Sequence, residues 1–439
     1  MSATATATAS AHTEDAGLRR VLGRWDLVAL VINGIVGAGI FGLPSKVHAL
    51  LGSWGIAAIV ACALLIGLVI LCFAEVGSRF TGTGGPYLYT RAAFGARPAF
   101  VVGWLLWLAR IAGIGAITSL LVQYLSAFFP AIAHGLPRAI FLTTVVMSLT
   151  AVNITGVLRA ARIGDAITIA KLLPLLVFVG VGLLHVQGSA FDFAQTPSNA
   201  NFSTGVLLLA FAFVGWESAV VTAGERRDPR RDLPFALIVG LAVVIVLYLA
   251  IQVVSVGTLP TLAGSERPLA DAARTFLGPF GSTMITVGAV ISMLGTVNGG
   301  LLTISRIPFA MADAGQLPPS LARLHPRYRT PVVSIVVSSV VVLALTLTST
   351  FTYVATISTV ARLLVFGVTC AALPVLRRQE QERPARFQLT GGPVIAVAAL
   401  LLIGWLLAST SWHETRDVLL AALVGLVIFG GWRVRPTNR

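Results

Sequence analysis

The sequence predicts an all-α integral membrane protein with about twelve transmembrane helices. Of its 439 residues, 56% are hydrophobic and only 11% are charged, and the mean hydropathy is +0.89. The apolar residues gather in repeated blocks of about 20, the length of helix that crosses a bilayer. The expected spans cover residues 26–50, 54–77, 98–129, 138–156, 164–187, 204–224, 234–259, 275–304, 331–349, 352–376, 391–410 and 416–432.

Residues 1–23 precede the first span and are small, polar and unpatterned at their start. They lack the basic region followed directly by a short apolar stretch that marks a cleaved signal peptide. We expect a disordered cytoplasmic tail.

The first span carries a glycine cluster in the stretch VINGIVGAGIFGLP, residues 31–44. Glycine lowers helix propensity by about 1 kcal/mol relative to alanine, so four glycines in this run predict a break. Backbone can leave the helix at membrane depth only where it lines a cavity enclosed by protein, because lipid offers no hydrogen bonds.

The sixth span repeats this pattern in residues 207–225, with Gly215 and a carboxylate, Glu217, near its middle. Two interrupted helices in matching places of two halves indicate a transporter binding site. The alternative is that the glycines only allow close helix packing, which is common in membranes. The paired interruptions and the buried acid favour the site.

The charged residues define a topology. The net charge is +14 and only Lys46 and Lys171 are lysines, so the positive charge is almost all arginine. In the loops, 23 arginines fall on the side of the N-terminus, against four on the other side: Arg138, Arg267, Arg274 and Arg416. This asymmetry places both termini in the cytoplasm and is a topology signal, which argues against a nucleic-acid-binding patch. Cys62, Cys72 and Cys370 lie in apolar runs and indicate packing.

Four ionisable residues fall at membrane depth: Arg110, Lys171, Glu217 and Arg362. Each costs about 2.5–3.5 kcal/mol at a helix centre on insertion scales, so a functional or pairing role is expected. The alternative is a salt-bridged network that never meets a substrate.

Several connecting segments look structured, and together with the two glycine-broken spans they carry a resemblance. These pieces are GAGIFGLP (37–44), GTGGPYLYTRAAFG (82–95), FVGWESA (213–219), the run 225–236 and ADAGQLPP (312–319). In this order they resemble the amino acid–polyamine–organocation (APC) superfamily of permeases, over residues 24 to 376. The resemblance implies a LeuT-type fold, with inverted repeats at 24–190 and 200–376. Residues 377–390 would then be a cytoplasmic loop, 391–432 two peripheral helices, and 433–439 a cytoplasmic tail.

The break in the first span suits an amino acid. The outer half of that span presents a helix N-terminus, which favours a carboxylate, and the carbonyl ends of the inner half and of the sixth span suit an ammonium group. The expected substrate-binding residues are Ile35, Val36, Gly37, Ala38, Gly39, Arg110, Phe211, Val214, Gly215 and Ser358.

The resemblance also assigns gating and coupling residues. Phe211 matches an aromatic gate over the substrate in the arginine/agmatine antiporter, with ordinary packing as the alternative. Lys171 matches a lysine that stands where sodium sits in sodium-coupled relatives. Its ammonium either exchanges a proton during transport or serves as a permanently charged strut. Glu217 matches an acid on the inner side of the site, and Arg362 falls near the same cavity.

Arg110 and Arg362 depart from that antiporter and argue against a cationic substrate. If Glu217 and the helix ends absorb both arginines, the pocket prefers neutral amino acids, which is the favoured outcome. If a surplus arginine faces the pocket, an acidic amino acid completes the pairing.

The sequence shows no metal-ligand spacing, no P-loop and no local nucleophile–base set, so we expect no metal, no cofactor and no enzyme. We expect a secondary active, sodium-independent amino-acid transporter of the cytoplasmic membrane, as a monomer or homodimer. The two alternatives for Lys171 leave open whether protons are coupled to transport. The alternatives are an amino-acid or amine exchanger, an acidic amino-acid carrier, and a non-transporting sensor or enzyme on the same fold.

Overall fold

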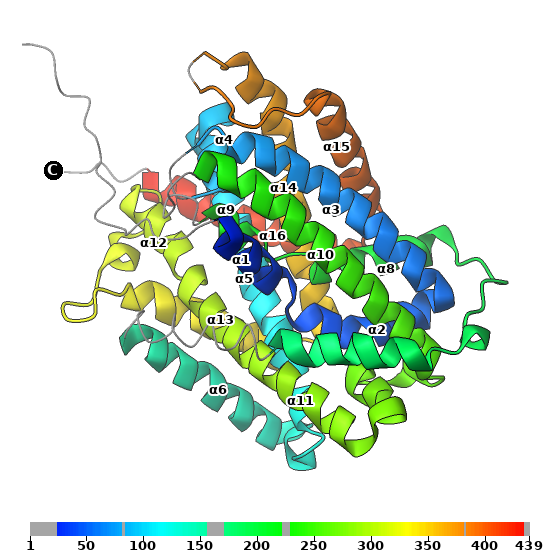
Figure 1. Ribbon diagram of the computed structural model, residues 1–439. Coiled ribbons are helices and arrows are strands. Elements are labelled where there is room, and N and C mark those ends of the chain that lie inside the picture. Colours follow the sequence, from blue (N-terminus) through cyan, green and yellow to red (C-terminus); the bar gives the residue numbers. More distant parts are fainter. Residues whose placement is uncertain (1–23, 81–83, 156–170, 222–228, 382, 434–439) are drawn as a thin grey trace, which may run out of the picture.

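The computed structural model describes residues 24–80, 84–155, 171–221, 229–381 and 383–433, which form helices joined by turns and no strand (Figure 1). The expected N-terminal tail, 1–23, and residues 434–439 of the expected C-terminal tail, 433–439, lie outside the described residues. Residues 156–170, which include the start of the expected fifth span, and residues 222–228 lie outside them too. The helices are α1 (Arg24–Ile35), α2 (Ala38–Leu51), α3 (Gly55–Gly77), α4 (Pro86–Phe94), α5 (Ala96–Leu125), α6 (Gly135–Thr155), an apolar helix at Lys171–His185, α8 (Asn199–Ala212), α9 (Glu217–Val221), α10 (Pro229–Thr258), α11 (Pro268–Ile304), α12 (Arg306–Asp313), α13 (Val332–Thr348), α14 (Phe351–Arg378), α15 (Gly392–Ala408) and α16 (Trp412–Arg433).

By length and hydropathy, six helical stretches in the described part of the chain can cross a membrane. Three shorter apolar helices, at Lys171–His185, Asn199–Ala212 and Val332–Thr348, add to them, and α15 and α16 form a pair bent by 113°. The protein is therefore an all-α, multi-pass membrane protein. The count of twelve spans and the inverted repeat stay predictions.

Helix α5 is the centre of the bundle. Within its most apolar window 94% of the residues are buried, and the helix packs against α14 and α11. Helix α10 packs against α1 and α3, while α6 and α13 lie side by side (Figure 1). The interior is thus built around α5, which carries Arg110.

A cluster of charged residues joins the ends of α3 and α14, and we call it the Glu75 clamp. Glu75 receives Nε and Nη2 of Arg377 at 2.7 and 2.6 Å, Nη2 of Arg79 at 3.0 Å and the amide of Leu389 at 2.9 Å. The side chains of Glu75 and Arg79 have no exposed surface. Arg79 also pairs with Glu380, which follows α14. Both oxygens of the buried carboxylate are therefore satisfied by charged donors.

Candidate functional site

The first span is interrupted between Ile35, where α1 ends, and Ala38, where α2 begins. The N-cap of α2 is Gly37, and no side chain caps the helix. Gly37, Ala38 and Gly39 all line a cavity. The amide groups of this first turn and the positive end of the helix dipole therefore face a space that an anion can occupy.

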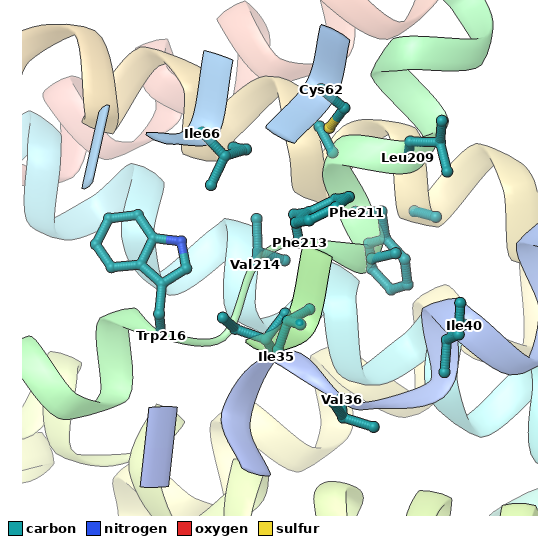
Figure 2. Packing of buried hydrophobic residues seen from close by; sticks show 14 of the residues in the cluster. Ile35, Val36, Ile40, Cys62, Ile66, Leu209, Phe211, Phe213, Val214 and Trp216 are labelled. Atoms are coloured by element: carbon teal, nitrogen blue, oxygen red, sulfur yellow. The ribbon is translucent and has the colours of Figure 1, made fainter. Parts of the chain in front are cut away.

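The sixth span is interrupted between Ala212, where α8 ends, and Glu217, where α9 begins. Figure 2 shows the two interruptions together, with Ile35 and Val36 at the end of α1 and Phe211, Phe213 and Val214 at the end of α8. Gly215 has φ of +120°, and a Cβ added there would overlap the carbonyl oxygen of Gly34. The two breaks are thus in direct backbone contact, which glycine allows.

Tyr248 of α10 links the two broken helices. Its hydroxyl lies 2.9 Å from the carbonyl oxygen of Ile35 and 3.0 Å from that of Ala212, the last residues of α1 and α8. A hydroxyl carries a single proton, so the two carbonyl groups share one donor. The sequence analysis missed this residue.

Lys171 points into the end of α1. Its Nζ donates to the carbonyl oxygens of Asn33 and Val36 at 2.6 and 2.8 Å, and the residue is buried. The ammonium group therefore lies at the negative end of the α1 dipole, where a cation is favoured.

Glu217 and Arg362 form an ion pair inside the membrane region. Arg362 Nε lies 2.9 Å from Glu217 Oε1, and Glu217 Oε2 accepts the amide of Gly215 at 2.5 Å. Arg362 Nη1 also donates to Ser358, whose hydroxyl donates to the carbonyl oxygen of Ala109 on α5. This pair therefore ties the second break to α14 and α5.

Arg110 of α5 reaches the same region with a different partner. Its Nη1 donates to the hydroxyl of Thr303 on α11 at 3.3 Å. It is near enough to Glu217 and Arg362 to interact with both charges. Within the described part of the chain, however, its only hydrogen-bond partner is that neutral hydroxyl.

These groups enclose a cavity of about 290 Å³, close to the lower end of the 300–1,000 Å³ range of small-molecule sites. The cavity brings together eleven of the residues expected from the sequence: Ile35, Gly37, Ala38, Gly39, Arg110, Lys171, Phe211, Val214, Gly215, Glu217 and Arg362. Val36 and Ser358 do not line it. Val36 contributes its carbonyl group to Lys171, and Ser358 holds Arg362.

Phe211 lines this cavity and contacts a residue of a second one. Its ring packs edge to face on Phe351 of α14, with centroids 6.0 Å apart. Phe211 lines the first cavity, whereas Phe351 lines the second, a polar hollow of about 440 Å³ that also includes Arg138 and Glu266. The contact between the two rings therefore joins a residue that lines one cavity to a residue that lines the other.

Comparison with known proteins gives the chain a set of relatives. A family model described as "Amino acid permease" matches residues 22–429. The serine/threonine exchanger SteT of Bacillus subtilis (strain 168) is 29% identical over 97% of this chain and 100% of its own length. The branched-chain amino acid permease BcaP of the same organism is 26% identical over 96% and 94%. The human Asc-type amino acid transporter 1 is 30% identical over 97% and 85%.

Proposed function

The chain belongs to the amino acid permease family, and from that premise we propose a secondary active amino-acid transporter that works by alternating access. The observation that carries the proposal is the cavity at the contact of two broken helices, where the uncapped start of α2 faces open space. Family and relatives alike point to transport and away from catalysis. The protein acts in the cytoplasmic membrane, with both termini in the cytoplasm.

The two ends of an α-amino acid find separate partners in this proposal. The substrate carboxylate binds the first-turn amides of α2, where the helix dipole favours an anion. The ammonium group binds the carbonyl end of α8. There, Tyr248 contacts the carbonyl oxygen of Ala212 alone, whereas Lys171 and Tyr248 together contact three carbonyl oxygens at the end of α1. Phe211 and Phe351 close the site on the side of the second cavity.

The first test is transport by the purified protein in liposomes, with each standard amino acid competing against a radiolabelled one. We expect saturable uptake. If the protein is an exchanger like its relative SteT, an amino acid on the opposite side of the membrane should accelerate this uptake. Conversion of an amino acid without flux would favour an enzyme and contradict the proposal.

Lys171 makes the cation dependence testable. Because its ammonium group fills the acceptor site at the end of α1, we expect uptake to be unchanged when sodium is replaced by choline. An imposed pH gradient separates the two roles of Lys171. Uptake that follows the gradient in wild type but not in Lys171→Ala indicates proton exchange, and uptake that ignores it indicates a strut. Uptake that requires sodium would contradict the assignment.

A further inference from the structure

The cavity carries more positive than negative charge. Among the described residues that line it, Arg110, Lys171 and Arg362 are cationic and Glu217 is the one acid. Burying a charge without a partner is costly, so each of these groups needs compensation. The partners of each charge therefore indicate what a substrate has to supply.

Two of the three cations are compensated within the protein. Arg362 pairs with Glu217 at 2.9 Å, and the other oxygen of that carboxylate accepts the Gly215 amide. Lys171 donates to two carbonyl groups at the end of a helix, which carries a negative partial charge. Glu217, already bound to Arg362 and to the Gly215 amide, is therefore not free to bind a further cation in the cavity.

Arg110 differs from both. Its hydrogen-bond partner among the described residues is the hydroxyl of Thr303, which itself lies against the carbonyl oxygens of Gly299 and Gly300 in its own helix. A guanidinium has five N–H donors in a fork that matches a carboxylate. The side chain is partly exposed and lines the cavity, so the unused donors can reach a ligand.

We propose that Arg110 binds a side-chain carboxylate of the substrate, so that the transported class is the acidic amino acids, aspartate and glutamate. This inference rests on the proposed transport function. A neutral amino acid is a zwitterion and adds no net charge, whereas an acidic one adds the missing negative charge beside Arg110. The preference for neutral substrates expected from the sequence required that protein groups compensate both arginines. Among the described residues, Glu217 pairs with Arg362, and Arg110 hydrogen-bonds only to a neutral hydroxyl.

The test compares glutamate with glutamine, which have nearly the same shape and differ in charge. Binding of L-glutamate, L-aspartate, L-glutamine, L-alanine and L-arginine is measured on the purified full chain, and uptake of the same five is measured in liposomes. We expect glutamate to bind at least about tenfold more tightly than glutamine, as a charge-assisted bidentate contact allows. In Arg110→Gln this ratio should fall to about one, and Arg110→Lys should restore part of it. Arg97→Gln, an exposed position on the same helix, should leave the ratio unchanged.

The outcomes separate this inference from the function beneath it. Transport of glutamine or alanine with exclusion of glutamate would overturn the acidic substrate class and leave the transporter intact. An Arg110→Gln protein with wild-type melting temperature that keeps the glutamate preference would overturn the role of Arg110. Failure of every standard amino acid to bind or cross the membrane would overturn the proposed function itself.

Discussion

Gly37 and Gly39 lie two residues apart at the start of α2, and the absence of a side chain has a different role at each position. A Cβ on Gly39 would come within 2.7 Å of the Cα of Ala212, so this glycine allows α2 to pack against α8. A Cβ on Gly37 would meet nothing closer than the carbonyl oxygen of Ile35, at 3.8 Å. Its φ of −116° is open to any residue. The space beside Gly37 is therefore free for a ligand.

We predict that Gly37→Ala folds normally but loses at least about tenfold in substrate affinity, because its methyl group enters the carboxylate site. Gly39→Ala should instead lose about 1–3 kcal/mol of stability through overpacking. Binding titrations and thermal melts in detergent separate the two effects. Gly404→Ala, at an open position on α15, is the control. Normal affinity in Gly37→Ala would remove this turn from the site.

Single residues were predictable from the sequence where their chemistry is unusual in a membrane. Arg110, Lys171, Glu217 and Arg362 stand out because a buried charge is costly, and all four line one cavity. Tyr248, Thr303 and Phe351 were missed because such residues are ordinary in apolar helices. Their roles depend on which side chains meet across helices, and a single sequence does not encode those pairings visibly.

The positions of the helices were predictable from the length of the apolar blocks, and the positions of the two breaks from the glycine residues. The first break spans residues 36–37, inside the glycine cluster 31–44 that predicted it, and α8 ends at Ala212, before Gly215 of the second pattern. The last carbonyl groups of both helices, those of Ile35 and Ala212, share the hydroxyl of Tyr248. Gly315, in the segment ADAGQLPP, follows the end of α12 with φ of +73°, a conformation in which glycine commonly ends a helix.

The Glu75 clamp was not predicted from the sequence. Glu75 falls near the end of its expected span, so it did not register as a charge at membrane depth. Its partners Arg377 and Leu389 lie some 300 residues away in the chain. Just beyond α14, burial opposes ionisation of Glu380, but the Ala385 amide and Arg79 outweigh it and lower the pKa. The Arg79–Glu380 pair therefore contributes at neutral pH and is lost as the pH falls through that lowered value.

We predict that Glu75→Gln strongly destabilises the protein, because it leaves Arg79 and Arg377 without their shared carboxylate. Breaking a buried ion pair by removing one partner costs about 3–5 kcal/mol. The unfolding midpoint in detergent should drop accordingly, while Glu266→Gln, at an exposed position, should not change it. Equal midpoints for Glu75→Gln and wild type would show that the clamp is dispensable.

At the scale of the whole molecule, the arginine asymmetry and the structure agree on which loops share a side. Arg79, Arg377 and Arg383, assigned to the cytoplasm by sequence, lie together, since Arg79 donates to the carbonyl oxygen of Arg383. Arg138 and Glu266, on loops assigned to the other face, line one cavity. These loops therefore share a face as their charges predict, while the assignment of one face to the cytoplasm stays a prediction. The number of spans also stays a prediction, because length and hydropathy do not decide how the short and bent helices cross the membrane.

We predict that the second cavity opens to the cell exterior and the Glu75 clamp to the cytoplasm. In a cysteine-free background, Glu266→Cys should react with a membrane-impermeant maleimide in intact cells. Arg386→Cys, exposed near the clamp, should react only after permeabilisation. The reverse pattern would invert the orientation of the whole chain.

The backbone contact between Gly34 and Gly215 constrains how this protein can diverge over time. A Cβ at either position would press on the other residue's main chain, and a Cβ on Gly34 would lie 2.6 Å from the carbonyl oxygen of Gly215. A clash between side chains can be relieved by a second mutation that shrinks the partner, but a main-chain carbonyl cannot be made smaller. A substitution of either glycine therefore cannot be compensated by a second substitution at the other position. A descendant that has replaced either one will have had to rebuild the meeting point of its broken helices, and its substrate with it.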